Sequence, residues 1–416
     1  MSRRHDVTAF RSWCRALLLP PLILCVLAGC ATRPQTVLKP LALAPGGDAA
    51  QVDMLVATTR KPVEDPAQLY SGDRGTAISF NSIVVSIPPD RNRKIGEVQW
   101  PSQVPANPKK EFAVLKVGKV ASEQNVLRWF RKNRNAKRQA VIFVHGFNSS
   151  YSDAVFRFAQ IVHDSGTDAA PILFTWPSRA SVSGYLYDKD STNYSRRALE
   201  DMILQAAESP DVGEVTILAH SMGAWLTAEA LRGVGMRNGT IPAKINNVIL
   251  ASPDIDVDVF RRQVIEMGPK LPHFTIFTST EDKALGISRL ISGGINRVGA
   301  LGDVDLAPHS ADLKRLGITV IDTSSVDPRD PLGHNAFADS PEMIRLLGRG
   351  LAGQSLEAGQ ATFAGQVSMA ATRTASFAGS AARAAVAAPM SVISGERVFK
   401  RDPYRERQIV DGEIAY

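Results

Sequence analysis

The sequence predicts an α/β fold in which a mostly parallel central sheet has helices on both faces. Strand-like and helix-like segments alternate along the chain, as they do where parallel strands are joined by crossover helices. Most of the predicted strands are apolar on both faces, which is typical of strands buried between two helix layers. These strands are expected at 140–144, 171–175, 214–219, 245–252, 273–279 and 317–322.

The segments before these strands follow a different pattern. Strands at 52–59 and 78–87, with shorter ones at 97–100 and 112–117, are closely spaced and separated by turn residues. We therefore expect antiparallel pairing in this part of the chain. Helices are then expected at 120–131, 151–164, 191–208, 222–236 and 338–349.

The N-terminus has the pattern of an export signal. Arginines precede the apolar run Ala16–Ala28, which is too short for an ordinary membrane span. The run ends in Leu27-Ala28-Gly29-Cys30, which resembles the lipobox of bacterial lipoproteins. We expect residues 1–29 to be a lipoprotein signal peptide and Cys30 to be acylated, so that the membrane is a partner. A plain secretory signal is the alternative.

Composition divides the rest of the chain into three parts. Residues 30–50 are rich in Pro, Ala and Gly and are expected to be a flexible tether, and residues 51–350 are expected to form the folded α/β domain. Residues 351–416 are rich in Ala, Gly and Ser and then charged, which is typical of a disordered tail. Ala31 after the lipobox favours the outer over the inner membrane of a bacterial cell envelope.

Charge and cysteine content limit the classes of partner. The formal net charge is only +7, and the basic run at 128–138 is interpreted as a solvated helix end, so we expect no nucleic-acid partner. Two of the three cysteines fall in the signal segment, which leaves the folded part without a disulfide or a cysteine metal site. No metal or organic cofactor is implied, and the oligomeric state is left open.

One short motif lies between the predicted strand at 214–219 and the helix at 222–236. It is Ala219-His220-Ser221-Met222-Gly223, a small-x-Ser-x-Gly sequence, and a sharp turn there would raise the Ser221 hydroxyl above the backbone. The helix would direct its N–H groups and positive dipole end at negative charge near this hydroxyl. The pattern is typical of a nucleophilic serine, and a serine that only caps the helix is the alternative.

A second turn, His145-Gly146-Phe147, follows the predicted strand at 140–144. A turn of this kind after a buried strand supplies a backbone N–H group to an oxyanion in many serine hydrolases. We therefore expect the amides of Phe147 and Met222 to form an oxyanion hole. The place of His145 beside the glycine favours a structural role in holding the loop over a role as catalytic base.

The candidate base emerges partly by elimination among seven histidines. His334 lies on a loop after the last predicted strand. The other six fall in the signal segment, in the two turns, in a helix, at the start of a strand or before the last strand. The sequence therefore favours His334 as the general base.

Two carboxylates are the main candidates for the acid that orients the base. Asp282 and Asp254 each follow a predicted strand, at the edge where open parallel sheets keep their sites. The chain order Ser221, Asp282, His334 is that of alpha/beta-hydrolases, which favours Asp282. Asp254 is the alternative and Glu281 is a third candidate.

Several segments together resemble a bacterial alpha/beta-hydrolase family of poorly defined function, also described as esterase/lipase superfamily enzymes. The resemblance implies the alpha/beta-hydrolase fold and a serine hydrolase that acts on ester bonds, but it does not identify the ester. The segments are VIFVHGFN, FTWPS, TILAHSMGAWL, ILASPDIDVDVF and TSTEDKALGIS.

The stretch 176–194 interrupts the regular alternation and is rich in Ser, Gly and aromatic residues. It would lie at the same sheet edge as Ser221, so it is a candidate pocket wall or lid, lined by Trp176, Tyr185 and Tyr187. An ordinary loop with a helix start is the alternative.

The function that the sequence favours is a membrane-anchored carboxylesterase or lipase-like enzyme that forms an acyl-enzyme. A thioesterase, amidase or acyltransferase would use the same chemistry. A lipid-anchored binding or structural protein on a hydrolase scaffold is the alternative from another class, because fold alone does not fix function.

Overall fold

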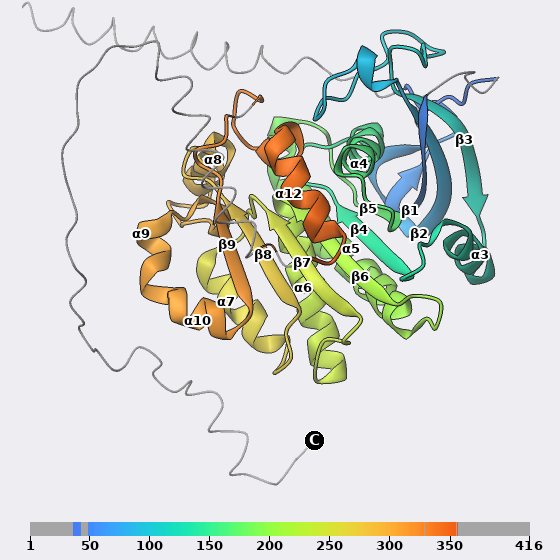
Figure 1. The fold of residues 1–416 in the computed structure, drawn as a ribbon. Helices are drawn as coiled ribbons and strands as arrows, with labels where there is room; N and C mark the ends of the chain where they lie inside the picture. The colour runs from blue at the N-terminus through green and yellow to red at the C-terminus, as the bar shows by residue number, and fades with distance from the viewer. Residues whose placement is uncertain (1–35, 43–48, 328, 355, 357–416) are drawn as a thin grey trace, which may run out of the picture. The chain divides into compact units, whose positions relative to one another are not determined.

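The computed structural model describes residues 36–42, 49–327, 329–354 and 356 (Figure 1). The predicted signal peptide, Cys30 and the tail from residue 357 onward lie outside these residues and remain predictions from the sequence. No helix within the described part of the chain combines the length and hydropathy that a membrane crossing requires.

A nine-stranded sheet in the order β3-β2-β1-β5-β4-β6-β7-β8-β9 forms the centre of the described chain. β1 to β3 pair antiparallel, and every pairing from β1–β5 to β8–β9 is parallel. The strands are β1 (Ala50–Pro62), β2 (Tyr70–Ile87), β3 (Ala113–Val120), β4 (Gln139–Val144), β5 (Ala170–Thr175), β6 (Glu214–His220), β7 (Ile245–Ala251), β8 (His273–Thr278) and β9 (Ile318–Asp322).

The strand order reverses around β4, because the chain adds β5 on one side of it and β6 on the other. Such a switch point opens a crevice at the carboxyl ends of the strands, where open parallel sheets bind their ligands. In register, Ile142 of β4 lies between Ile172 of β5 and Ile217 of β6. The loops that follow β4 and β6 therefore emerge side by side at this edge.

Helices cover both faces of the sheet (Figure 1). Side chains of α3, α5, α6 and α7 pack on one face, and those of α4, α11 and α12 pack on the other. The helices are α3 (Glu123–Asn133), α4 (Tyr151–Ser165), α5 (Tyr185–Glu208), α6 (Met222–Asn238), α7 (Val257–Glu266), α8 (Lys283–Ile291), α9 (Asp303–Leu306), α10 (Ser310–Arg315), α11 (Ala336–Asp339) and α12 (Pro341–Leu351).

Alternation along the strands separates the two cores. In β4, Ile142 and Val144 belong to the core under α5 and α6, whereas Val141 and Phe143 belong to the core under α4 and α12. A strand buried on both faces must be apolar at every position, which is why the sequence of β4 shows no polar alternation.

The structure differs from the sequence-based prediction at several elements. Residues 97–100 form no strand: Glu97 N donates to Lys94 O in a turn, and Gln99 O accepts from Phe112 N outside the named strands. The predicted helix at 120–131 begins at Glu123, since β3 continues to Val120. α5 begins six residues earlier than predicted, and the sequence did not predict α8.

Part of the predicted tether contacts the domain. Val37 and Leu38 are buried, and the backbone N–H groups of Leu38 and Leu41 donate to Ala67 O and Val114 O at 2.8 and 2.9 Å. At the other end of the domain, Leu356 is also buried. Contacts with the domain thus extend a few residues beyond 51–350 at both ends.

Candidate active site

Ser221 occupies a strained turn between β6 and α6. Its φ of 52° lies in the left-handed region, which non-glycine residues enter at a cost of about 1–3 kcal/mol. The backbone of the turn is held by hydrogen bonds from Ser221 N to Ala251 O (2.9 Å) and from Asp254 N to Ser221 O (3.2 Å). Its side chain makes no capping hydrogen bond to α6, so the helix-cap interpretation is not supported.

Two glycines allow the turns after β4 and β6 to approach each other. A Cβ at position 223 would lie 2.2 Å from His145 O and 2.6 Å from Val144 O. A Cβ at position 146 would lie 2.9 Å from Ser221 Cβ. Because the obstructing atoms at position 223 are backbone, any side chain there would push the two turns apart.

The predicted oxyanion donors lie in these two turns. Met222 is the first residue of α6, so its amide lies at the positive end of the helix dipole. Phe147 follows Gly146 in the neighbouring turn. Within the described residues, neither amide donates a hydrogen bond to another protein group, which leaves both available to a ligand.

The predicted base and the favoured acid contact each other. His334 Nδ1 and Asp282 Oδ2 are 2.7 Å apart, and the Asp282 side chain is fully buried while that of His334 is 14% exposed. Asp282 Oδ1 accepts from Leu285 N (3.0 Å) and so caps α8. Because Nδ1 is bound to the carboxylate, Nε2 of His334 remains for another partner.

Asp282 also determines the titration of His334. Burial alone lowers the pKa of His334, but the charge of Asp282 and its hydrogen bond outweigh burial and raise the pKa above the ordinary value of 6.5. A raised pKa makes the neutral imidazole a stronger proton acceptor.

Asp254 has a different set of partners. Its carboxylate lies 3.2 Å from Arg297 Nε and accepts hydrogen bonds from Ser288 Oγ (2.6 Å) and Tyr185 OH (2.9 Å). The structure thus places the alternative acid in a buried network that joins α5, α8 and the loop after β7, and not against His334. Glu281, the third candidate, is exposed.

The loop that carries His334 is fixed by carboxylates that the sequence reasoning missed. Asp330 accepts from the backbone N–H groups of His334 and Asn335, both at 3.0 Å. An aspartate a few residues before a loop histidine is the only local signal for this turn.

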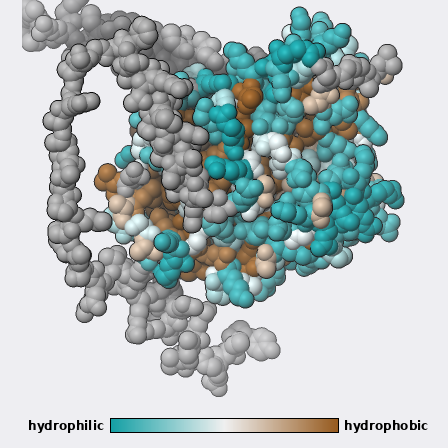
Figure 2. All heavy atoms as spheres, viewed as in Figure 1, coloured by the Kyte–Doolittle hydropathy of each residue, from teal (hydrophilic) through white to brown (hydrophobic). Residues whose placement is uncertain are grey.

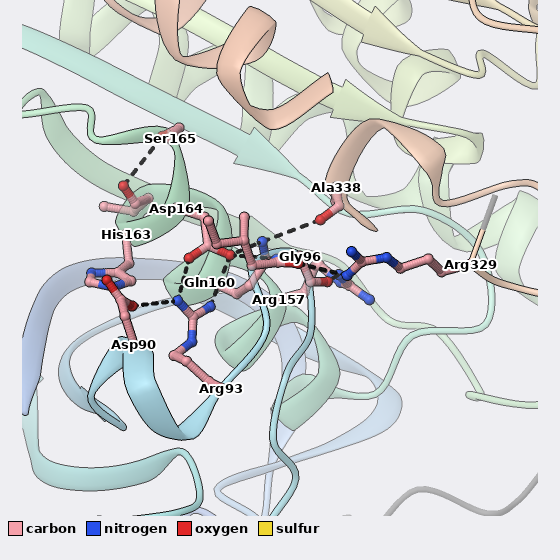
Figure 3. Close-up of polar contacts among 12 residues, drawn as sticks. Asp90, Arg93, Gly96, Arg157, Gln160, His163, Asp164, Ser165, Arg329 and Ala338 are labelled. Carbon is pink, nitrogen blue, oxygen red and sulfur yellow. Dashed lines mark hydrogen bonds and ion pairs between the residues drawn. The ribbon is translucent and has the colours of Figure 1, made fainter. Parts of the chain in front are cut away.

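Behind the loop, α4 holds α11 through a polar cluster, drawn in Figure 3. Arg157 Nη1 lies 2.7 Å from Asp339 Oδ1, and Gln160 Nε2 donates to Ala338 O. Arg93 forms a two-pronged ion pair with Asp164 at 2.6 and 2.9 Å. The contacts of Arg157 and Gln160 connect α11, which follows the His334 loop, to α4.

His220 contacts the candidate base directly. Its Nε2 lies 3.1 Å from His334 O, and its ring lies 4.6 Å from the rings of His334 and Phe337. A carbonyl accepts only, so Nε2 carries the proton. Burial holds the pKa of His220 well below its ordinary value, and the residue is therefore neutral. Its position within the nucleophile motif is the only sequence signal for this role.

His145 has the structural role expected from the sequence. Trp176 N donates to its Nε2 at 3.1 Å, so Nδ1 carries the proton and donates to Gly146 O at 2.9 Å. Burial and the Arg60 charge lower the pKa of His145 to about 3. Arg60 is itself fully buried. Its guanidinium group donates hydrogen bonds to backbone carbonyls and to Thr175 Oγ1.

The three aromatic residues predicted to line a pocket differ in position. Trp176 is fully buried and stacks on His145 at 4.9 Å, so its prediction as a pocket wall was wrong. Tyr187 bonds Gly72 O and lies under the guanidinium groups of Arg74 and Arg179. Tyr185 alone contacts a candidate site residue, with its ring 5.3 Å from that of Phe147.

Within the described residues, no group of three or more His, Cys, Asp or Glu side chains is arranged to hold a metal ion.

Comparison with known families gives one match. The model of a family described as alpha/beta hydrolase of unknown function (DUF900) matches residues 119–350. This match and the helix-flanked, mostly parallel sheet confirm the predicted fold class. No curated protein matches the chain.

Among solved structures, an esterase of Pyrococcus furiosus is 10% identical with a TM-score of 0.32, covering 77% of this chain and 99% of that chain. Brefeldin A esterase, described as a bacterial homologue of human hormone sensitive lipase, is 13% identical with a TM-score of 0.34, covering 80% and 84%. One of two fungal esterases from Rhizomucor miehei is 13% identical with a TM-score of 0.30, covering 80% and 90%.

The close packing of Gly223 against the backbone of the β4 turn predicts the effect of a substitution on stability. We expect Gly223→Ala to lower the free energy of unfolding by about 1–3 kcal/mol, because the added methyl overlaps two backbone carbonyls. Gly286→Ala is the matched control, since nothing lies within 4 Å of a Cβ there and alanine favours the helix. Urea unfolding measures both, and equal stability of the two variants would contradict the packing argument.

Proposed function

Because the chain belongs to the alpha/beta-hydrolase family of unknown function, we propose that it is a serine hydrolase that cleaves acyl esters. The observation that supports this most is the 2.7 Å contact between His334 and Asp282, at the same sheet edge as the strained Ser221 turn. In this proposal Ser221 is the nucleophile, His334 the general base and Asp282 the acid that orients it.

The proposed reaction has two steps. Ser221 Oγ attacks the ester carbonyl carbon and gives its proton to Nε2 of His334. The bond to the alcohol oxygen breaks, and the alcohol leaves with that proton. Water then attacks the acyl-enzyme, His334 takes a proton from it, and this proton returns to Ser221 as the carboxylic acid leaves.

Electrostatics favour the charged intermediates. The amides of Phe147 and Met222 would donate to the oxyanion, and removal of one such donor typically costs about 10²–10³ in turnover. The buried Asp282 carboxylate would stabilise the imidazolium that forms when His334 accepts the proton. Transfer to another alcohol, or attack on thioesters or amides, would use the same acyl-enzyme.

Fluorophosphonate labelling tests the nucleophile and base. We expect the chain of residues 31–416, which contains every described residue, to be labelled, and Ser221→Ala and His334→Ala to reduce labelling by at least about 100-fold. The exposed residues Ser325 and His309 provide the controls Ser325→Ala and His309→Ala, which should label normally. A folded but unlabelled wild-type protein would overturn the proposal and favour a binding protein on a hydrolase scaffold.

The raised pKa of His334 predicts the pH dependence. The base acts only when neutral, so kcat/KM for a soluble ester should rise with pH through an apparent pKa above 6.5. Asp282→Asn removes the charge that raises this pKa, so the rise of kcat/KM should move to lower pH while the rate falls by about 10⁴. Asp305→Asn, which removes an exposed carboxylate, should leave the pH of this rise unchanged. If the rise stays at the same pH in Asp282→Asn, Asp282 is not the partner of His334.

His220 is expected to position His334. His220→Phe keeps a ring beside His334 but removes the donor to His334 O, and one hydrogen bond is worth roughly 0.5–1.5 kcal/mol. We therefore expect kcat to fall about 2- to 10-fold with little change in KM, and His220→Gln, which keeps an N–H donor, to restore part of it. A KM effect alone would show that His220 serves the substrate pocket instead.

A further inference from the structure

Exposed apolar side chains gather on two segments that lie side by side. One is 182–186, at the start of α5, where Leu186 is 70% exposed, and the other is α8 with residues 292–295, where Leu290 is 79% exposed. Tyr185 OH and Ser288 Oγ are 2.9 Å apart and join the two segments. We name this set the apolar rim: Val182, Leu186, Ile287, Leu290, Ile291 and Ile295.

The apolar rim borders the candidate active site. α8 begins at its cap Asp282, the residue that contacts His334, and Figure 1 shows this helix at the end of the sheet where β8 and β9 finish. Tyr185, next to Leu186, packs its ring on Phe147. On α8, Leu285 and Ser288 face inward and are buried, so the apolar residues between and after them face outward and are not covered by the described part of the chain.

The charge of the two segments is entirely positive. Residues 283–302 contain no Asp or Glu but three cationic residues, of which Lys283 and Arg289 are exposed and Arg297 is buried against Asp254. Residues 176–187 likewise contain no acidic residue and one arginine, Arg179, which forms an ion pair with Asp73 of β2. An apolar helix face flanked by exposed cations is the pattern of a segment that lies in the headgroup region of a membrane.

Acidic residues limit this face on one side. Asp256, Asp258 and Asp305 line a hollow of about 360 Å³ next to α9, and Ile295 at the end of the rim also lines it. Figure 2 shows hydrophobic side chains over α9 as well, but the aspartates beside them make that area a poor match for an anionic surface. The rim therefore consists of the two segments that carry only positive charge.

We propose that the apolar rim docks on a lipid surface that carries anionic headgroups. Leu186, Leu290 and their neighbours enter the boundary between headgroups and acyl chains, and Lys283 and Arg289 contact the anionic headgroups. Docking in this way presents the site to amphiphilic esters at the surface. That choice of substrate rests on the proposed hydrolase function, whereas docking itself requires no catalysis.

Vesicle co-sedimentation of residues 31–416 tests the proposal. Vesicles of phosphatidylcholine with 30% phosphatidylglycerol should bind the wild-type protein, and vesicles of phosphatidylcholine alone should bind at least about 5-fold more weakly, since Lys283 and Arg289 would lack anionic partners. Leu186→Gln with Leu290→Gln should lower the bound fraction at least about 10-fold, because both side chains lose their affinity for the acyl region.

The matched control is Met236→Gln with Ile265→Gln. These side chains are also exposed and apolar, but they lie near the C-terminal ends of α6 and α7, at the opposite edge of the sheet. The control should bind vesicles as the wild type does, and so should Ser221→Ala, which separates docking from catalysis. Equal loss in both double variants, no binding by the wild type, or self-association that the rim variant abolishes would each overturn lipid docking.

Discussion

The site depends on the close approach of two backbone turns, one after β4 and one after β6. Only hydrogen atoms at positions 146 and 223 leave room for it, because a Cβ at 223 would collide with two carbonyl oxygens. The approach holds Ser221 at a positive φ and places the amides of Phe147 and Met222 in neighbouring turns. Parallel neighbours β4 and β6 end in register, so the sheet itself brings the two turns together.

Around these turns, the surroundings of three histidines give them different chemistry. Burial lowers the pKa of His145 and His220 and keeps both neutral, so each acts as a fixed hydrogen-bond partner for the backbone. His334 is buried too, but the Asp282 carboxylate reverses the effect and raises its pKa. Proximity of a histidine to Ser221 is therefore not enough to identify a base. The partner carboxylate distinguishes His334 from the other two.

The sequence predicted the parallel strands and the contact between His334 and Asp282 because their signals are local. Apolar runs identify buried strands, and chain order selected Asp282 over Asp254. α8 was not predicted because it is short and contains Gly286, and its stability comes from the cap at Asp282 and from packing of Leu285.

Contacts between distant parts of the chain could not be predicted in the same way. The stack of Trp176 on His145 and the hydrogen bond of His220 to His334 join residues 31 and 114 positions apart. An aromatic residue after a strand has the same local pattern whether it lines a pocket or fills a core. Only the packing against β4 decides that Trp176 is buried.

Asp282 joins the chemistry of the site to the surface beside it. One carboxylate oxygen contacts His334, and the other caps α8, so the orientation of the imidazole and the start of this helix share a single side chain. Ser288, farther along α8, bonds Asp254, whose backbone N–H holds Ser221 O. Hydrogen bonds thus connect α8 both to His334, through Asp282, and to the Ser221 turn, through Ser288 and Asp254.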